Sequence, residues 1–498
     1  MSKFFNTAGL CFPHKHYMVD PLSRLTEVEE LIKKEFYFTI HAPRQTGKTT
    51  FLYALARKLN TEGNYTALVV SFESAGYRSI EIDKANEIVI NSIYQASVAM
   101  LPEERRPENP DNKEFLNLKD YLFQWAGGQD KPIVLLVDEI DALYDDVLIS
   151  ILRQLRDGYQ LRPKSFPSSI ALVGLRDVRE YKAVLRPDSL FLRNFSQDEV
   201  AELLRQHTTE TGQKLEHGVS EEIFHLSGGQ PWLVNALANH AVARILKDDF
   251  SQPVTMDIIK LARRQLILRR DTHLDSLADK LREERVKRIV QAIINGASIA
   301  FDVLDDDISY IRDLGIVSQS SPLKFANPIY AEIIPRIMAS PMQESIPEEI
   351  QPPAFIDANG RLDMDRVLRE FQEFYRRNAE AWLERYLYKE SAHHLLLMAF
   401  LQRVINAGGD IVREMAVSNG RIDLLVRYKQ QEFALELKVL RDKHTIEDGL
   451  KQLDRYLDRL NLHHGYLIVF APTPKDWEEK IHFRTTPHNQ KTITHIGL

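Results

Sequence analysis

Short apolar runs alternate with amphipathic stretches in the first part of the chain. The runs that predict buried strands are residues 36–41, 65–72, 133–137 and 169–174. The stretch 50–59 has its apolar residues on one side of a helix. Because these strands are apolar almost throughout, they suit a parallel sheet that is covered by helices on both faces. The pattern therefore predicts an α/β domain.

Past Phe195 the strand pattern stops and helical patterns continue to about residue 270. Ser196 followed three residues later by Glu199 predicts a capped helix start, since each side chain can satisfy a backbone N–H of the other. Two glycines ahead of Pro231 predict another helix start, with proline at the first helical position. We therefore expect a helical domain after the sheet.

The rest of the chain predicts three further parts. Residues 272–338 contain two helical patterns and a short apolar run at 314–317, which is the layout of a winged helix. Residues 341–360 are rich in proline and glutamate and predict a linker. A long helical pattern follows, from Asp363 to about Asn406. Strands are then predicted at 411–416, 422–428, 432–439 and 465–470.

Composition narrows the function classes. The 498 residues suggest about three domains, and the 44% hydrophobic and 27% charged fractions suit a soluble protein with buried cores. A net charge of -7 excludes a basic nucleic-acid coat, so any such contact needs a local patch. Cys11, the one cysteine, is expected to be a structural thiol in the cytoplasm. No apolar stretch approaches the ~20 residues that span a bilayer, so we expect no membrane contact.

A phosphate-binding loop follows the first predicted strand. It comprises Ala42, Pro43, Arg44, Gln45, Thr46, Gly47, Lys48, Thr49 and Thr50. The pattern G-x-x-x-x-G-K-[ST] is intact except that Ala42 replaces the first glycine. Gly47 lets backbone N–H groups turn toward phosphate oxygens. Lys48 can neutralise the β- and γ-phosphates and Thr49 can place its hydroxyl on Mg²⁺, so we expect ATP with Mg²⁺.

Two strand ends supply partners for this loop. Asp138 and Glu139 follow the apolar run 133–137, at the carboxyl end of a strand where ligands of parallel sheets bind. Asp138 would hold Mg²⁺, and Glu139 would orient or deprotonate the attacking water. Arg176 follows the fourth run and could sense the γ-phosphate. The alternatives are an acidic helix N-terminus and an ordinary surface arginine.

Residues 1–340 resemble the AAA-like ATPases of the STAND and archaeal-ATPase group. The resemblance rests on the phosphate loop, Arg176, the Gly229-Gln230-Pro231 motif and, in the winged-helix segment, the run 326–330. It implies that Arg176 and Pro231 contact the nucleotide and that the helices after the sheet form a lid. The chain has no strong match to the arginine finger of hexameric AAA+ motors, and homo-oligomer formation stays open.

A second set of polar residues lies near the end of the chain. Asp423 comes at the start of one predicted strand, and Glu436 and Lys438 lie two residues apart on the next, so they share a face. Two carboxylates can bind a divalent metal that activates water and stabilises charge on a phosphodiester. Lys438 could orient the water or stabilise the transition state.

Residues 361–498 resemble the PD-(D/E)XK nuclease superfamily, in its RecB-like branch. The matching residues are Asp423, Glu436, Lys438, Gln452 and Tyr456, the last two as Q-x-x-x-Y. The resemblance also implies a glutamate on the preceding helix, for which Glu390 is our choice and Glu384 the second. Asp423 and Glu436 would hold Mg²⁺, with Mn²⁺ as a substitute. The alternatives are a chance arrangement of exposed charges and a degenerate, inactive nuclease fold.

These observations predict an α/β protein with a P-loop parallel sheet, a helical lid, a winged helix and a C-terminal mixed-sheet domain of restriction-endonuclease type. The predicted domains are a P-loop ATPase core at 1–195, the lid at 196–270, a winged-helix-like domain at 271–340, a linker at 341–360 and a nuclease-like domain at 361–498.

We expect a protein that binds and hydrolyses ATP and whose nucleotide state regulates a Mg²⁺-dependent phosphodiesterase. The phosphodiesterase would be an endo- or exodeoxyribonuclease, with DNA favoured over RNA as the nucleic-acid partner. The alternative is a signalling or scaffold ATPase whose C-terminal domain binds nucleic acid or a partner without cutting. ATP could be turned over continuously or used once per activation.

Overall fold

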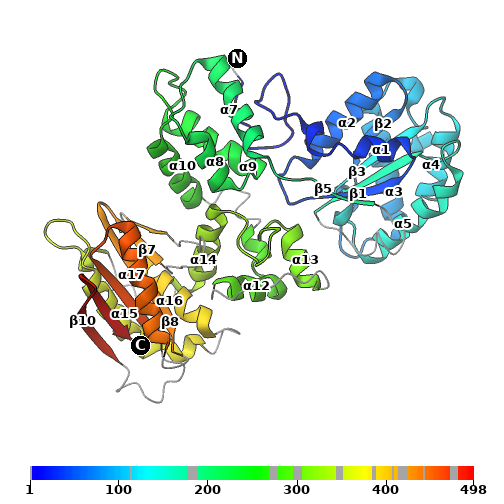
Figure 1. Ribbon diagram of the computed structural model, residues 1–498. Helices are drawn as coiled ribbons and strands as arrows, with labels where there is room; N and C mark the ends of the chain where they lie inside the picture. The colour runs from blue at the N-terminus through cyan, green and yellow to red at the C-terminus, as the bar shows by residue number, and fades with distance from the viewer. Residues whose placement is uncertain are drawn as a thin grey trace. The chain divides into compact units, whose positions relative to one another are not determined.

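The computed structural model describes residues 3–112, 115–175, 188–269, 277–294, 305–343, 352–383, 389–405, 409–412, 424–440, 444–470 and 481–498. The chain divides into two compact units (Figure 1). The first is Met1–His273 with Ser309–Ile316, and the second is Leu274–Ile308 with Val317–Leu498.

A parallel sheet forms the centre of the first unit. Its strands are β1 (Tyr37–His41), β2 (Thr66–Ser71), β3 (Ile133–Asp138), β4 (Ser169–Gly174) and β5 (Asp188–Phe191). They run in the order β2-β3-β4-β1-β5, and every neighbouring pair is parallel. The first four strands confirm the prediction. Strand β5 was not predicted, because it is a short edge strand with partly exposed residues.

Helices cover both faces of this sheet, as the apolar strands predicted. They are α1 (Val28–Lys33), α2 (Lys48–Glu62), α3 (Ile82–Met100), α4 (Leu118–Gly127) and α5 (Asp145–Gly158). Leu135 and Val137 of β3 pack in one core with α3, α4 and α5. Val134 and Leu136 pack in the other core with α1 and α2. Successive strand residues point to opposite faces, so a strand buried on both sides is apolar throughout.

A helical region follows the sheet. Its helices are α7 (Gln197–Thr211), α8 (Val219–Ser227), α9 (Pro231–Asn239), the π-helix η7 (His240–Ile245) and α10 (Met256–Arg269). The predicted capping box is confirmed, because Ser196 Oγ accepts from Glu199 N and the Glu199 carboxylate accepts from Ser196 N. Pro231 begins α9, as predicted. Short 3₁₀ helices are η1 (Pro21–Arg24), η2 (Glu73–Ala75), η3 (Glu103–Arg105), η4 (Pro110–Asn112), η5 (Ile140–Ala142), η6 (Tyr159–Leu161) and η8 (Pro352–Phe355).

The remaining helices belong mostly to the second unit. They are α12 (Glu284–Ile294), α14 (Pro328–Gln343), α15 (Met364–Leu383), α16 (Lys389–Ile405) and α17 (Thr445–Leu460), while α13 (Asp306–Asp313) crosses the division between the units. In the segment predicted to be a winged helix, one isolated antiparallel bridge joins Val317 to Phe325. Helix α14 packs against α16, and Arg336 of α14 donates to the Ile411 carbonyl at 3.3 Å. This helix therefore packs against α16 and contacts the edge of the C-terminal sheet at β6.

The C-terminal sheet is mixed. Its strands are β6 (Gly409–Val412), β7 (Leu424–Tyr428), β8 (Gln431–Val439), β9 (His464–Phe470), β10 (His482–His488) and β11 (Lys491–Gly497). The order is β10-β11-β9-β8-β7-β6, with β8, β9 and β11 parallel and the other pairs antiparallel. A mixed sheet was predicted. Strands β10 and β11 were missed, because threonine and histidine dilute their apolar pattern.

Helix α16 contains the most apolar run of the chain, residues 395–401. All seven of these residues are buried, because the helix lies between α14, α15 and β6. Among the helices in the described ranges, none is long and apolar enough to cross a membrane.

Candidate functional site

The phosphate loop connects β1 to α2 and contains two left-handed residues. Gln45 has φ 58° and Gly47, which caps α2, has φ 90°. A side chain is strained in this backbone region, whereas glycine adopts it freely. A methyl group added at Gly47 would also lie 3.3 Å from Arg24 Nη1. The backbone conformation at this position therefore favours glycine, and Arg24 leaves little room for a side chain.

Ala42 occupies the position where the motif has its first glycine. It is fully buried and packs in the core formed with α1 and α2. Its N–H donates to the Gly174 carbonyl at 3.3 Å, and its φ is not among the positive values of the loop. Because the backbone at Ala42 is not left-handed and its methyl group has a place in the core, alanine can replace glycine here.

Lys48 is buried beside the loop, with 6% of its surface exposed. Its Nζ donates to the carbonyls of Ala42 at 2.9 Å and Pro43 at 3.0 Å. Burial lowers the pKa of the Lys48 ammonium, and the carboxylates of Glu139 and Asp138 oppose that shift. The cation therefore lies against the loop in a place where an anion would compensate its burial.

The end of β3 lies next to the start of α2. Thr49 Oγ1 donates to Asp138 Oδ2 at 2.6 Å, and Asp138 Oδ1 accepts from Glu139 N at 3.1 Å. Glu139 has a left-handed φ of 52°. Burial raises the pKa of both carboxyl groups. The predicted loop hydroxyl and strand-end carboxylate are thus in direct contact, although β4 separates β3 from β1 in the sheet.

A cavity of about 470 Å³ opens over the loop. Predicted residues that line it are Arg44, Gln45, Thr46, Gly47, Lys48, Thr49, Thr50, Glu139 and Pro231. Gln230, beside Pro231, donates to the carbonyls of Arg44 and Gln45 at 3.4 Å each. The Gly229-Gln230-Pro231 motif therefore contacts the loop directly. Arg176 lies outside the described residues.

The N-terminal segment supplies a wall of this cavity that the sequence analysis missed. Additional lining residues are Asn6, Thr7, Ala8, Gly9, Leu10, Cys11, Tyr17, Met18, Val19, Pro21 and Arg24. Trp232 Nε1 donates to the Thr7 carbonyl at 2.8 Å, and the amide of Gln206 bonds both backbone groups of Met18. Cys11 N donates to Thr50 Oγ1 at 3.4 Å. The segment carries no motif, so only its folded contacts reveal it.

The phosphate loop offers oxygen ligands rather than a ready-made metal cage. Within the described ranges, no three His, Cys, Asp or Glu side chains form a group that could hold a metal ion. Mg²⁺ in proteins is usually bound by one or two carboxylates together with substrate phosphates and water. The Thr49 hydroxyl and Asp138 carboxylate, in contact at 2.6 Å, fit that pattern.

The C-terminal cluster centres on Lys438 of β8. Its Nζ lies 2.7 Å from Glu436 Oε1 on the same strand and donates to Gln452 Oε1 of α17 at 2.6 Å. Glu436 is fully buried. Helix α17 lies close to the sheet at Gly449, where a methyl group would lie 2.8 Å from Leu467 Cδ1 and 3.2 Å from Lys438 Cγ. Three predicted residues are therefore brought together.

Of the other residues predicted for this cluster, the structure describes only some. Tyr456 lies one helical turn after Gln452 and is 5% exposed. Its hydroxyl has no hydrogen-bond partner among the described residues. Asp423 lies outside the described residues, as do Glu384 and the side chain of Glu390.

Comparison with known proteins gives structural matches of low sequence identity. No protein-family profile matches the chain, and no curated protein matches it. The Walker-type ATPase PABY2304 of Pyrococcus abyssi matches with 14% identity and a TM-score of 0.48, over 66% of this chain and 98% of that one.

Two other solved structures match at lower TM-scores. The RuvB Holliday junction branch migration motor of Thermotoga maritima matches with 15% identity and a TM-score of 0.34, over 60% and 88% of the two chains. Cdc6p from Pyrobaculum aerophilum matches with 12% identity and a TM-score of 0.35, over 65% and 94%. The first unit has a P-loop α/β fold. Its phosphate loop, the strand order of its parallel sheet and the hydrogen bond between Thr49 and Asp138 show this.

Proposed function

We propose that this protein binds ATP with Mg²⁺ at the phosphate loop and hydrolyses it. The hydrogen bond between Thr49 Oγ1 and Asp138 Oδ2 carries the proposal, because it joins the loop hydroxyl to the acidic end of a buried strand. Lys48 gives further support. A buried ammonium whose bonds go to backbone carbonyls would gain from the negative phosphates of a nucleotide.

Each residue then has a role in the reaction. Lys48 would exchange its carbonyl partners for oxygens of the β- and γ-phosphates. Thr49 and Asp138 would hold Mg²⁺, which neutralises phosphate charge when it is bound. Glu139 would accept the proton of the attacking water, and burial raises its pKa in the direction that suits a general base. Arg176 and Pro231 keep the contacts with nucleotide that the family resemblance implies.

Nucleotide binding by titration calorimetry and phosphate release test this proposal. Lys48→Ala should weaken ATP binding about 100-fold, because charge-assisted bonds to phosphate are lost. Glu139→Gln should still bind ATP but hydrolyse it about 100-fold more slowly. The matched control is Lys58→Ala on the same helix, where Lys58 pairs with Glu29 at the surface. Unchanged ATP affinity in Lys48→Ala would contradict the proposal.

We further propose that the C-terminal domain is a metal-dependent phosphodiesterase that acts on DNA. The chain of contacts from Glu436 through Lys438 to Gln452 supports it. So does the order of elements, in which a helix, three antiparallel strands, a helix and a parallel strand follow each other from α16 to β9. Asp423 directly precedes β7, beside β8 in the sheet.

In this proposal Asp423 and Glu436 supply carboxylate oxygens, the ligand type that Mg²⁺ and Mn²⁺ prefer. The bound metal would acidify water and stabilise the phosphate charge. Lys438 would stabilise the transition state, with its ammonium oriented by Gln452. Tyr456 would support the helix face that carries Gln452, and Glu390 keeps the role that the resemblance implies.

Cleavage of linear, circular and single-stranded DNA, and of RNA, tests the nuclease. Each substrate is incubated with Mg²⁺ or Mn²⁺, with and without ATP. Asp423→Ala and Lys438→Ala should abolish cleavage. Glu432→Gln should not, because Glu432 lies on the same strand but pairs with Arg427 at the surface. If both site variants cut as fast as the wild type, the nuclease assignment is wrong.

One observation favours the alternative function, a signalling or scaffold ATPase with a C-terminal domain that binds without cutting. Glu436 is fully buried and its charge is matched by Lys438 at 2.7 Å, which is also what a purely structural ion pair looks like. This alternative predicts that Lys48→Ala abolishes ATP binding while no substrate is cleaved under any metal condition. The same incubations therefore separate the two functions.

Regulation of cleavage by nucleotide is the last part of the proposal. Two sites in one chain support it. One is the phosphate loop, where Thr49 bonds Asp138, and the other is the cluster around Lys438. Cleavage should depend on ATP in the wild type and become insensitive to ATP in Lys48→Ala. Steady-state hydrolysis would indicate continuous turnover, whereas tight ADP retention with negligible hydrolysis would indicate a switch that is used once.

A further inference from the structure

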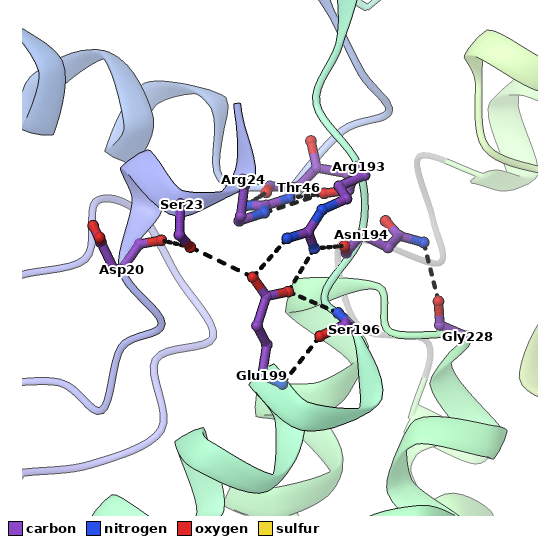
Figure 2. A network of polar contacts seen from close by, with 9 residues as sticks. All are labelled: Asp20, Ser23, Arg24, Thr46, Arg193, Asn194, Ser196, Glu199 and Gly228. Carbon is purple, nitrogen blue, oxygen red and sulfur yellow. Dashed lines mark hydrogen bonds and ion pairs between the residues drawn. The ribbon is translucent and has the colours of Figure 1, made fainter. Parts of the chain in front are cut away.

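Arg24 is a buried arginine that no motif of the sequence pointed to. It ends η1, and 6% of its surface is exposed. Its guanidinium contacts two distant segments, as Figure 2 shows. Nη1 donates to the Thr46 carbonyl at 2.7 Å, while Nε donates to the Arg193 carbonyl at 3.1 Å and Nη2 also contacts that carbonyl. One rigid group thus joins the phosphate loop to the segment that leads into α7.

The contact with Thr46 fixes a functional part of the loop. The peptide unit is planar and nearly always trans, so its carbonyl and the following N–H point in opposite directions. By holding the Thr46 carbonyl, Arg24 also sets the direction of the Gly47 N–H. In a phosphate loop such N–H groups bind phosphate oxygens. Any change in this peptide on phosphate binding must alter the bond to Arg24.

The contact with Arg193 reaches the connection between the sheet and the lid, which we define as residues 192–196. At its start, Leu192 N donates to the His41 carbonyl at the end of β1. At its end, Phe195 N donates to the Gly229 carbonyl at 2.9 Å, and Gly229 has no room for a side chain because a methyl group would lie 2.1 Å from Phe195 O. Movement of this connection therefore moves the turn before Pro231.

The surroundings of the guanidinium favour arginine over lysine at position 24, because they use its geometry as well as its charge. Arg193 donates to Glu199 at 2.6 Å and lowers the pKa of that carboxyl to about 2, so this pair is already neutral. Burial lowers the pKa of Arg24 to about 10, so it stays charged near neutral pH. Its guanidinium stacks over the Phe195 ring at 5.0 Å. A planar fork of donors can hold two carbonyls and a ring at once, whereas a single ammonium cannot.

We propose that Arg24 is a positioning residue that couples phosphate binding at the loop to the connection ahead of the lid. Phosphates that draw the Gly47 N–H toward them would rotate the Thr46 carbonyl, and the rigid guanidinium would transmit this motion to the Arg193 carbonyl. This inference rests on the proposed nucleotide binding. It predicts that a variant can keep its nucleotide and lose the response of the lid.

Hydrogen exchange of the full chain tests the coupling. The probe is Mg²⁺ with a non-hydrolysable ATP analogue, at a saturating concentration for each variant. In the wild type, protection should increase both at the loop, residues 42–50, and at the connection, residues 192–196. In Arg24→Met and Arg24→Lys the loop should still respond, while the response of the connection should fall at least threefold. Lys34→Met, at an exposed ion pair with Glu30, is the matched control and should respond as the wild type does.

The outcomes separate this inference from the proposed function. A wild-type response at the connection in both Arg24 variants would overturn the coupling and leave nucleotide binding intact. No response at the loop of the wild type would instead contradict nucleotide binding itself. If Arg24→Met does not fold, Arg24→Lys decides the question, because it keeps the buried charge and changes only the geometry of its donors.

Discussion

One lysine marks each of the two candidate sites, and the two differ in burial and surroundings, since Lys48 is buried whereas the Lys438 side chain is 22% exposed. Lys48 donates to the carbonyls of Ala42 and Pro43 and lies beside a cavity of about 470 Å³. Lys438 lies 2.7 Å from the Glu436 carboxylate and also donates to Gln452. The first cation donates to backbone carbonyls next to open space and has the carboxylates of Glu139 and Asp138 nearby, whereas the second is in direct contact with its counter-charge.

This difference teaches what burial of a charge says about function. A buried ammonium without a matched carboxylate costs free energy, and an anionic ligand can recover that cost. The loop is therefore completed by binding. Lys438 and Glu436 already form an ion pair with each other, so their chemistry as a nuclease has to be tested by cleavage. Replacing each lysine in turn should therefore affect ligand binding at one site and stability at the other.

Replacing Lys438 with methionine should have the largest effect on folding. It would leave the fully buried Glu436 without its cation, at a cost of about 3 kcal/mol of unfolding free energy. Urea unfolding measures this, and Lys48→Met should change the same quantity by less than about 1 kcal/mol. Adding Glu436→Gln to Lys438→Met should recover part of the loss. Equal destabilisation by the two lysine variants would show that the two lysines do not differ in this way.

For ligand binding the order of the two lysines should reverse. Lys48→Met should weaken ATP binding about 100-fold, equivalent to about 2.7 kcal/mol, because its charge-assisted bonds to phosphate are lost. Lys438→Met should leave ATP affinity unchanged at temperatures where the variant is folded. Titration calorimetry on both proteins measures the difference. A comparable loss of ATP affinity in Lys438→Met would mean that Lys48 is not specific to the nucleotide site.

The pH dependence of binding should also separate the sites. Burial raises the pKa of Asp138 and Glu139, so the empty protein holds these protons more tightly than an unfolded chain does. Stability of the empty protein should therefore fall as pH rises through the interval between the ordinary and raised values. Mg²⁺ with ATP favours the ionised carboxylates, so its affinity should rise over that interval with release of protons. Calorimetry in two buffers of different ionisation enthalpy measures this release, and Asp138→Asn should reduce it.

The smallest effects should come from the two neutral hydrogen-bond partners. Thr49→Val removes the bond to Asp138, and Gln452→Leu removes the bond to Lys438. Each should lower the unfolding free energy by about 1 kcal/mol. Of the two, Thr49→Val alone should weaken binding of ATP with Mg²⁺. If Gln452→Leu weakened that binding equally, the two sites would share a ligand and the separation would fail.

The parts of the fold that were predicted have local causes. Strands β1 to β4 were predicted because both of their faces are buried and the apolar run is continuous. The starts of α7 and α9 were predicted because Ser196, Glu199 and Pro231 act within one helical turn. Strands β5, β10 and β11 were missed, since edge and partly exposed strands have a weaker apolar pattern.

The sequence by itself determined the phosphate loop, because Gly47, Lys48 and Thr49 are consecutive residues between one strand and one helix. It also indicated Asp138, which follows a continuous apolar strand, and Lys438, which lies two residues from Glu436 and so on the same face of its strand. Only the tertiary structure decided that Asp138 meets Thr49, that Gln452 meets Lys438 and that Arg24 joins Thr46 to Arg193. These contacts join residues far apart in the chain, and their geometry depends on how whole elements pack, which no local pattern specifies.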